Sequence, residues 1–135
     1  MGTFAVTLEI GDPQGSRFET VEALVDTGAT LTSAPASLLR RLGVEATRRG
    51  TFEYADGRRV ELEIGETRVK VEGIETTTSV LFGAEDAEPL LGAMTLEGLL
   101  LGVDPFNRRL VPIVGMLKTA SLQEHFELAL PAPAC

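Results

Sequence analysis

Alternating apolar and polar positions run through most of the chain and predict β-strands. An alternation of period two is typical of a strand that buries one face and exposes the other. Asp56-Gly57, which separates two such segments, is a strong hairpin signal. Gly and Pro mark further turns at 11–15 and 102–105. The segments with this pattern, or with a short apolar run bounded by turns, are 4–10, 17–25, 51–54, 59–64, 67–71, 76–82 and 109–114.

Two segments carry helical rather than alternating patterns. Residues 35–42 have apolar spacing for a short helix, with Ser33 as a candidate cap and Gly43 at the end. A second short helix is predicted over 94–101. No linker or low-complexity block interrupts the first 115 or so residues. We therefore expect a mainly β domain over 1–116, and an extension over 117–135 that is partly helical or flexible.

A weak internal repeat relates two parts of this predicted domain. Residues 24–44 and 90–103 both run from an apolar strand through a Gly-Ala turn and a short helix to Leu-Gly-Val. Such common residues can also produce the similarity by chance. If the repeat is real, the domain has two pseudo-equivalent halves and only the first carries an acid at the turn.

Composition and charge narrow the function classes. A chain of 135 residues with 44% apolar residues fits one globular domain. Its net charge of -8 argues against nucleic-acid binding, which needs a basic surface. No apolar run approaches the ~20 residues of a membrane span. The single cysteine, Cys135, and a start without signal-peptide character favour a reducing, cytoplasmic location. The acidic loop at 85–88 has no histidine beside it, so no metal site is expected.

Candidate chemistry centres on the five residues that follow the apolar run 23–25. They place a carboxylate on a tight turn at the edge of the predicted core. An Asp-Thr-Gly tripeptide alone is weak evidence, because Asp and Gly are common in turns. The segment reads Asp26, Thr27, Gly28, Ala29 and Thr30.

In its full context this segment resembles the retropepsin-like (retroviral-type) aspartic peptidases, in particular their small single-domain prokaryotic members. The resemblance covers residues 3–115 and rests on an ordered set of motifs. It implies a closed, mostly antiparallel β barrel with one or two short helices, and activity as a symmetric homodimer. The motifs are 23–30, the helix from Pro35, the hairpin 55–58, the Leu-Leu-Gly of 90–92, and 103–112.

Peptide hydrolysis by carboxyl groups requires two of them on one water molecule. One must be ionised to take a proton from the water, and the other must be protonated to donate to the peptide carbonyl. This chain has one Asp-Thr-Gly, so we expect the second acid to be Asp26 of another copy. The reaction needs no metal or cofactor.

The residues around Asp26 receive definite roles in this interpretation. Thr27 would hydrogen-bond across the dimer axis, and Gly28 would allow close approach of the partner backbone. Ala29 would face the substrate, and Thr30 would brace the turn. Leu90, Leu91 and Gly92 would pack beneath the loop. A flap over the cleft is predicted from Tyr54, Ala55, Asp56, Gly57 and Arg58, although this hairpin could also be an ordinary sheet edge.

Three functions remain open from the sequence. The leading hypothesis is an aspartic endopeptidase that acts on peptide or protein substrates. The second is a retropepsin-like dimerisation or protein-binding module with little or no activity. The third is a self-processing fragment of a polyprotein, although the chain start favours a free-standing protein. Residues 117–135 depart from the family pattern, and they could join the dimer or occlude a neighbour's cleft.

Overall fold

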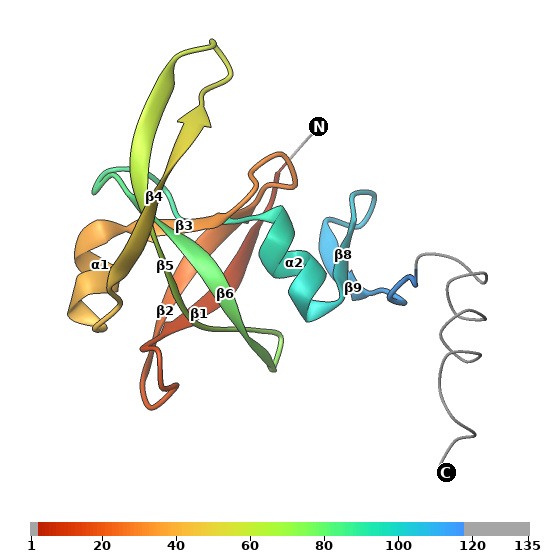
Figure 1. Ribbon diagram of the computed structural model, residues 1–135. Coiled ribbons are helices and arrows are strands. Elements are labelled where there is room, and N and C mark those ends of the chain that lie inside the picture. Colours follow the sequence, from red (N-terminus) through yellow and green to blue (C-terminus); the bar gives the residue numbers. More distant parts are fainter. Residues whose placement is uncertain (1–2, 118–135) are drawn as a thin grey trace, which may run out of the picture.

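A closed ring of six strands forms the body of the protein in the computed structural model, which describes residues 3–117 (Figure 1). The last strand of the ring, β5, pairs back onto β1 and closes it. The sequence-based prediction of a mainly β, closed, retropepsin-like fold is confirmed. In ring order the strands are β1 (Ala5–Gly11), β2 (Phe18–Val25), β7 (Leu90–Leu91), β3 (Thr32–Pro35), β6 (Ile74–Gly83) and β5 (Arg59–Val71).

The sheet is mixed rather than wholly antiparallel. Strand β7 runs parallel to β2, and β3 runs parallel to β6, whereas β1 with β2 and β5 with β6 are antiparallel. The parallel partners are not consecutive in the chain, and other elements lie between them, so no hairpin links them. A seventh strand, β4 (Ala46–Glu53), pairs with β5 outside the ring.

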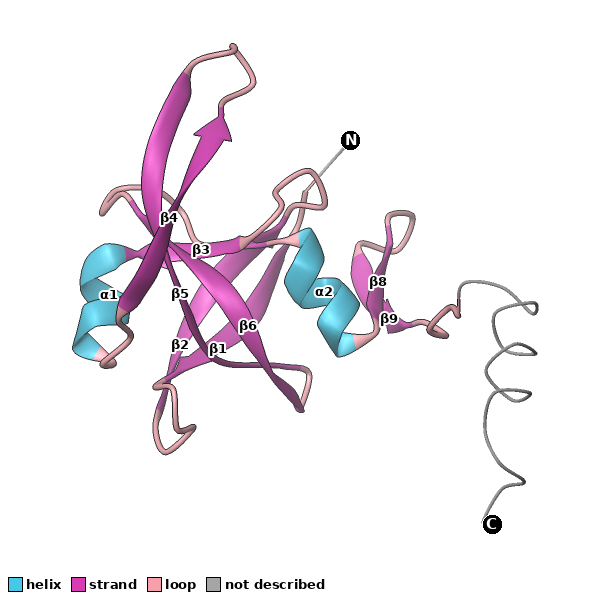
Figure 2. Cartoon of the chain, viewed as in Figure 1, coloured by secondary structure: helices cyan, strands magenta, loops and turns pink. Residues whose placement is uncertain are grey.

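Two short helices and a small hairpin complete the described chain (Figure 2). Helix α1 (Ala36–Arg41) follows β3, and helix α2 (Ala93–Leu99) follows β7. The chain then forms an antiparallel pair from β8 (Leu101–Asp104) and β9 (Arg109–Pro112). None of the helices within residues 3–117 is long and apolar enough to cross a bilayer.

Several element boundaries differ from the sequence-based expectation. The segments 59–64 and 67–71 are one 13-residue strand. Gly65, within this strand, allows close packing, since a Cβ atom would lie 2.5 Å from the Glu45 carbonyl oxygen. Ser33 does not cap α1, because the helix begins after Pro35 without a side-chain cap. The helix predicted over 94–101 ends earlier, because α2 ends at Leu99 and β8 begins at Leu101.

Three strands were missing from the list of predicted strand segments, although the internal repeat treated Leu90-Leu91 as an apolar strand. They are only two to four residues long, and none has room for a clear alternation. The extended conformation of β3 and β7 comes from pairing with segments distant in sequence, as when Ser33 pairs with Leu90, whereas β8 pairs with the neighbouring β9. The intervening strand β3 also makes the first half of the proposed internal repeat longer than the second. The strands missing from that list are β3, β7 and β8.

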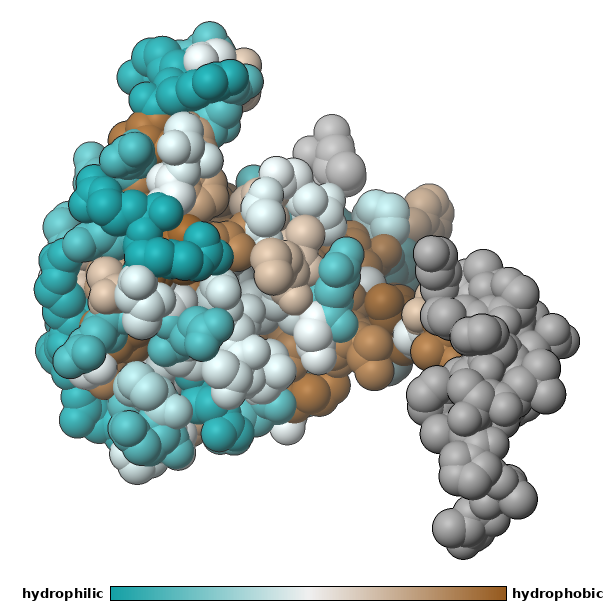
Figure 3. Space-filling model, in the orientation of Figure 1, coloured by the Kyte–Doolittle hydropathy of each residue, from teal (hydrophilic) through white to brown (hydrophobic). Residues whose placement is uncertain are grey.

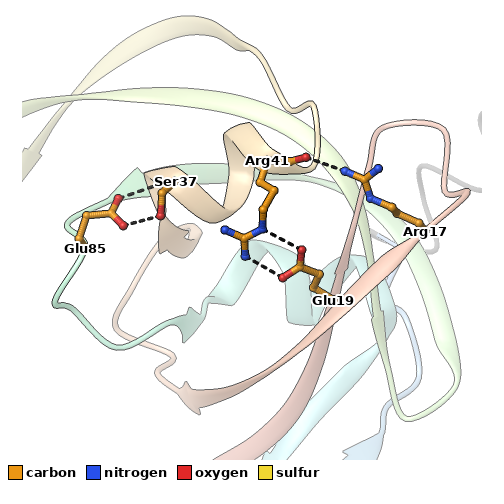
Figure 4. A network of polar contacts seen from close by, with 5 residues as sticks. All are labelled: Arg17, Glu19, Ser37, Arg41 and Glu85. Carbon is orange, nitrogen blue, oxygen red and sulfur yellow. Dashed lines mark hydrogen bonds and ion pairs between the residues drawn. The ribbon is translucent and has the colours of Figure 1, made fainter.

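The core fills the inside of the ring and extends beneath α1. Fully buried side chains from β1, β5, β6 and β7 meet there, and Leu39 and Leu42 close one side. On the outer side of α1, Arg41 donates two hydrogen bonds to Glu19 (Figure 4). These bonds lower the pKa of the Glu19 carboxyl. Exposed ion pairs contribute little, so burial of the leucines holds α1 in place.

Candidate active site

Asp26 lies at the exit of β2, where the strand leaves the core. Val25 before it is buried, whereas Asp26 is half-buried. Its backbone N–H donates to the Leu91 carbonyl at 3.0 Å, so β7 fixes the start of the turn. Its Oδ1 accepts a hydrogen bond from the Gly28 N–H at 2.9 Å. The carboxyl group is therefore oriented by its own loop before any partner is present.

Leu90 and Leu91 pair with the strands on both sides of this loop. Leu91 pairs in parallel with Val25, and Leu90 lies between β2 and β3. Gly92 follows at a point where the chain passes directly over β3. A Cβ atom on Gly92 would lie 2.5 Å from the Leu31 carbonyl carbon. Only glycine fits this crossing without displacing backbone.

Helix α2 begins against the same loop. The N–H groups of Ala93 and Met94 donate to the carbonyls of Ala29 and Thr30, at 2.8 and 3.1 Å. These are N–H groups of the first helical turn, which have no partner within a helix. No side chain caps α2, so the Asp26 loop itself serves as the cap. The backbone carbonyls of Ala29 and Thr30 thus join the Asp26 loop to the start of α2.

Two hollows flank the loop. One, of about 290 Å³, is lined by Asp26, Thr27 and residues from the chain start and β8. The other, of about 540 Å³, lies on the opposite side of Gly28. Its walls come from the loop, from neighbouring strands and from the part of the β4–β5 hairpin next to its turn, and most of their side chains are apolar. They include Ala29, Leu31, Leu90, Phe52, Leu62 and Tyr54.

The proposed flap is the tip of the β4–β5 hairpin, which projects from the body (Figure 1). Asp56 accepts hydrogen bonds from the Arg58 backbone N–H and from its guanidinium, at 3.0 and 2.7 Å. These bonds lower the pKa of the Asp56 carboxyl. The Arg58 guanidinium also stacks over the Tyr54 ring, 4.8 Å from its centroid. The tip is ordered by its own contacts, with Gly57 at a φ of 90°.

Three buried threonines near the loop were not singled out from the sequence. Their hydroxyl groups are linked to one another between β3, β6 and α2. A threonine in a short apolar segment gives no signal of such a role, because its partners lie up to 63 residues away. The residues are Thr32, Thr78 and Thr95.

A closed mixed β ring with one Asp-Thr-Gly turn braced by a short strand and helix defines the retropepsin-like class of fold. The family model described as gag-polyprotein putative aspartyl protease matches residues 18–108, and the chain belongs to this family. The solution structure of simian foamy virus (mac) protease is similar, with a TM-score of 0.51. That match has 21% identity and covers 70% of this chain and 92% of the viral one, so it supports the fold alone. No curated protein matches the chain.

Proposed function

We propose that this chain is an aspartic endopeptidase whose active site forms when two copies meet at Asp26. The observation that carries the proposal is the half-buried Asp26 carboxyl, held at 2.9 Å by the Gly28 N–H between two hollows. Membership of an aspartyl protease family supports it. Similarity to the prokaryotic members in particular stays a prediction.

Two carboxyl groups in contact share one proton, because both cannot ionise easily. The ionised Asp26 takes a proton from a water molecule as the water oxygen attacks the peptide carbonyl carbon. The protonated Asp26 of the other copy donates to the carbonyl oxygen. The tetrahedral species then collapses: the C–N bond breaks, the leaving nitrogen takes a proton from one carboxyl, and a hydroxyl of the tetrahedral species returns a proton to the other, so the pair again shares one proton.

The homodimer follows from the single acid and from the exposed loop. Thr27 and Gly28 are both exposed, as residues at a two-fold axis would be in one isolated copy. Large apolar side chains are also exposed in the C-terminal part of the described chain, where Figure 3 shows apolar surface near α2 and the β8–β9 hairpin. The most exposed are Phe106, Val114 and Met116, at 92%, 87% and 90%. Their burial against a second copy would stabilise the pair.

Substrate would lie in the larger hollow, between the Asp26 loop and the part of the β4–β5 hairpin next to its turn. Its apolar walls suit apolar side chains of an extended peptide. The tip of residues 54–58 would close over the peptide as a flap and exclude water. Ala29 and Tyr54 both line this hollow and would contact the substrate.

Replacing Asp26 by Asn tests the function directly. We expect Asp26→Asn to abolish cleavage of unfolded casein, because an amide cannot exchange the proton that the reaction needs. The variant should keep the wild-type urea midpoint and the wild-type sedimentation behaviour. Cleavage at the wild-type rate by this variant would show that the assignment is wrong. A wild-type dimer that cleaves nothing would favour the binding-module alternative.

A further inference from the structure

Three hydroxyl groups form a buried chain beneath the Asp26 loop. Thr32 Oγ1 accepts a hydrogen bond from the Gly92 N–H at 3.0 Å and donates to Thr95 Oγ1 at 2.6 Å. Thr95 Oγ1 lies 2.8 Å from Thr78 Oγ1. Each hydroxyl has one hydrogen, so Thr95 is left free to donate to Thr78. The three residues join β3, α2 and β6, and their exposed fractions are 0%, 1% and 9%.

We propose that Thr95 is a positioning residue, which sets the placement of the Asp26 carboxyl through the start of α2. This inference rests on the proposed function and adds a residue that never contacts substrate. Thr95 lies in the first turn of α2, on its buried face. It anchors the helix to β3 and β6 at the point where the helix start supports the loop.

The connection from Thr95 to Asp26 runs through backbone groups. The helix start donates to the carbonyls of Ala29 and Thr30, and the Leu91 carbonyl accepts from the Asp26 N–H. Gly92, between these contacts, donates to Thr32. A shift of α2 therefore moves both ends of the Asp26 loop together. In a homodimer, both copies carry the same shift, so both displacements contribute to the change in distance between the two carboxyls.

A hydroxyl chain suits this task better than apolar packing. Apolar contacts are non-directional, so they restrict the angle and distance of a helix less sharply than hydrogen bonds do. Hydrogen bonds fix distance and angle, and a buried hydroxyl that loses its partner is costly. Thr95→Val keeps the side-chain shape, but it removes the donor and acceptor at the centre of the chain.

Thr67 offers a matched control. It is a threonine on β5 with 1% exposure, and it donates to the Gly11 carbonyl. Gly11 pairs with Phe18 at the ends of β1 and β2 that lie away from Asp26. Thr67→Val therefore also removes a buried hydroxyl hydrogen bond, but far from the loop. Comparing Thr95→Val with Thr67→Val therefore distinguishes the effect of losing a buried hydrogen bond from the effect of misplacing the Asp26 loop.

The test measures kcat and KM on a fluorogenic peptide that the wild-type protein cleaves. We expect Thr95→Val to lower kcat by about 10- to 100-fold, as small misplacements of reacting groups do, with KM within about two-fold. Thr95→Ser should restore most of kcat, and Thr67→Val should leave it unchanged. Equal kcat in Thr95→Val and Thr67→Val would overturn the proposal.

A second readout does not depend on activity. Amide hydrogen exchange at Asp26, Ala93 and Met94 should accelerate in Thr95→Val and stay at the wild-type rate in Thr67→Val. Unchanged exchange at these amides would overturn the proposal even if the wild-type protein cleaves nothing. If Thr95→Val does not fold, Thr78→Val takes its place, with a smaller loss of kcat expected and an unchanged kcat counting against the proposal.

Discussion

Gly92 shows how tightly single atoms are arranged around the site. Its φ of -96° is accessible to any residue, so the position does not require glycine for its backbone conformation. The requirement is space, because a Cβ atom would lie 2.5 and 2.6 Å from the carbonyl carbon and oxygen of Leu31. A sequence shows a glycine as a turn signal, but it cannot show which backbone crosses over it.

We expect Gly92→Ala to lower the free energy of unfolding by about 1–3 kcal/mol, since backbone must shift to admit the methyl group. Gly98→Ala, in the same helix, is the control. There the nearest atom to a new Cβ is Thr76 Oγ1 at 4.0 Å. Alanine lowers the conformational entropy of the unfolded chain, so this substitution should stabilise the protein by about 0.5–1 kcal/mol. Urea unfolding at an unchanged m-value measures both. Equal midpoints for the two variants would contradict this account.

At the scale of elements, the longer strands and β9 could be predicted from the sequence, whereas β3 and β8 could not. The hairpin between β4 and β5 was predicted from Asp56-Gly57, and the structure places its turn there. Strand β7 has only two residues, and its place between β2 and β3 depends on pairing across the ring. The candidate acid could be predicted because its motif is local. The backbone groups that hydrogen-bond to its loop come from residues about 65 positions later in the chain.

The β4–β5 hairpin gives the element-scale prediction. Asp56→Ala removes the acceptor that orders the tip, so kcat/KM should fall while the urea midpoint of the domain stays close to wild type. The folded-state pKa of Asp56 is lowered, so its bonds are complete above about pH 4 and are lost as pH falls through that lowered value. The assay therefore belongs between about pH 5 and pH 7. Asp86→Ala, on the exposed loop before β7, is the control.

If Asp56→Ala leaves kcat/KM unchanged although amide relaxation shows faster motion of residues 54–58, the flap assignment is wrong. The hairpin would then be an ordinary sheet edge.

At the scale of the whole molecule, activity and oligomeric state form one hypothesis. One copy holds one Asp26 on an exposed loop, and its C-terminal region exposes apolar side chains such as Phe106. A two-fold axis at Gly28 would bring both acids together and bury apolar surface. The predicted role of residues 117–135 in the dimer lies almost wholly outside the described residues.

Mixing inactive chains with wild-type chains tests this hypothesis. If each active site needs two Asp26 residues, an equal amount of exchanged Asp26→Asn chains should reduce cleavage per wild-type chain to about half. A monomeric enzyme would show no reduction. The control adds the same amount of a protein that does not exchange with this chain. Dilution of the wild-type protein should also lower its specific activity.

The sequence by itself determined the β-rich class, the hairpin at Asp56-Gly57 and the candidate acid, because alternation, turn chemistry and a five-residue motif are local properties. Only the tertiary structure decided that the ring is mixed, which hydrogen bonds join β7 and α2 to the Asp26 loop, and that three distant threonines meet beneath it. Those features depend on pairing and close approach between segments far apart in the chain, and no local pattern encodes which atoms meet. Asp26 was visible in the sequence, whereas the hydrogen bonds that hold its loop in place were not.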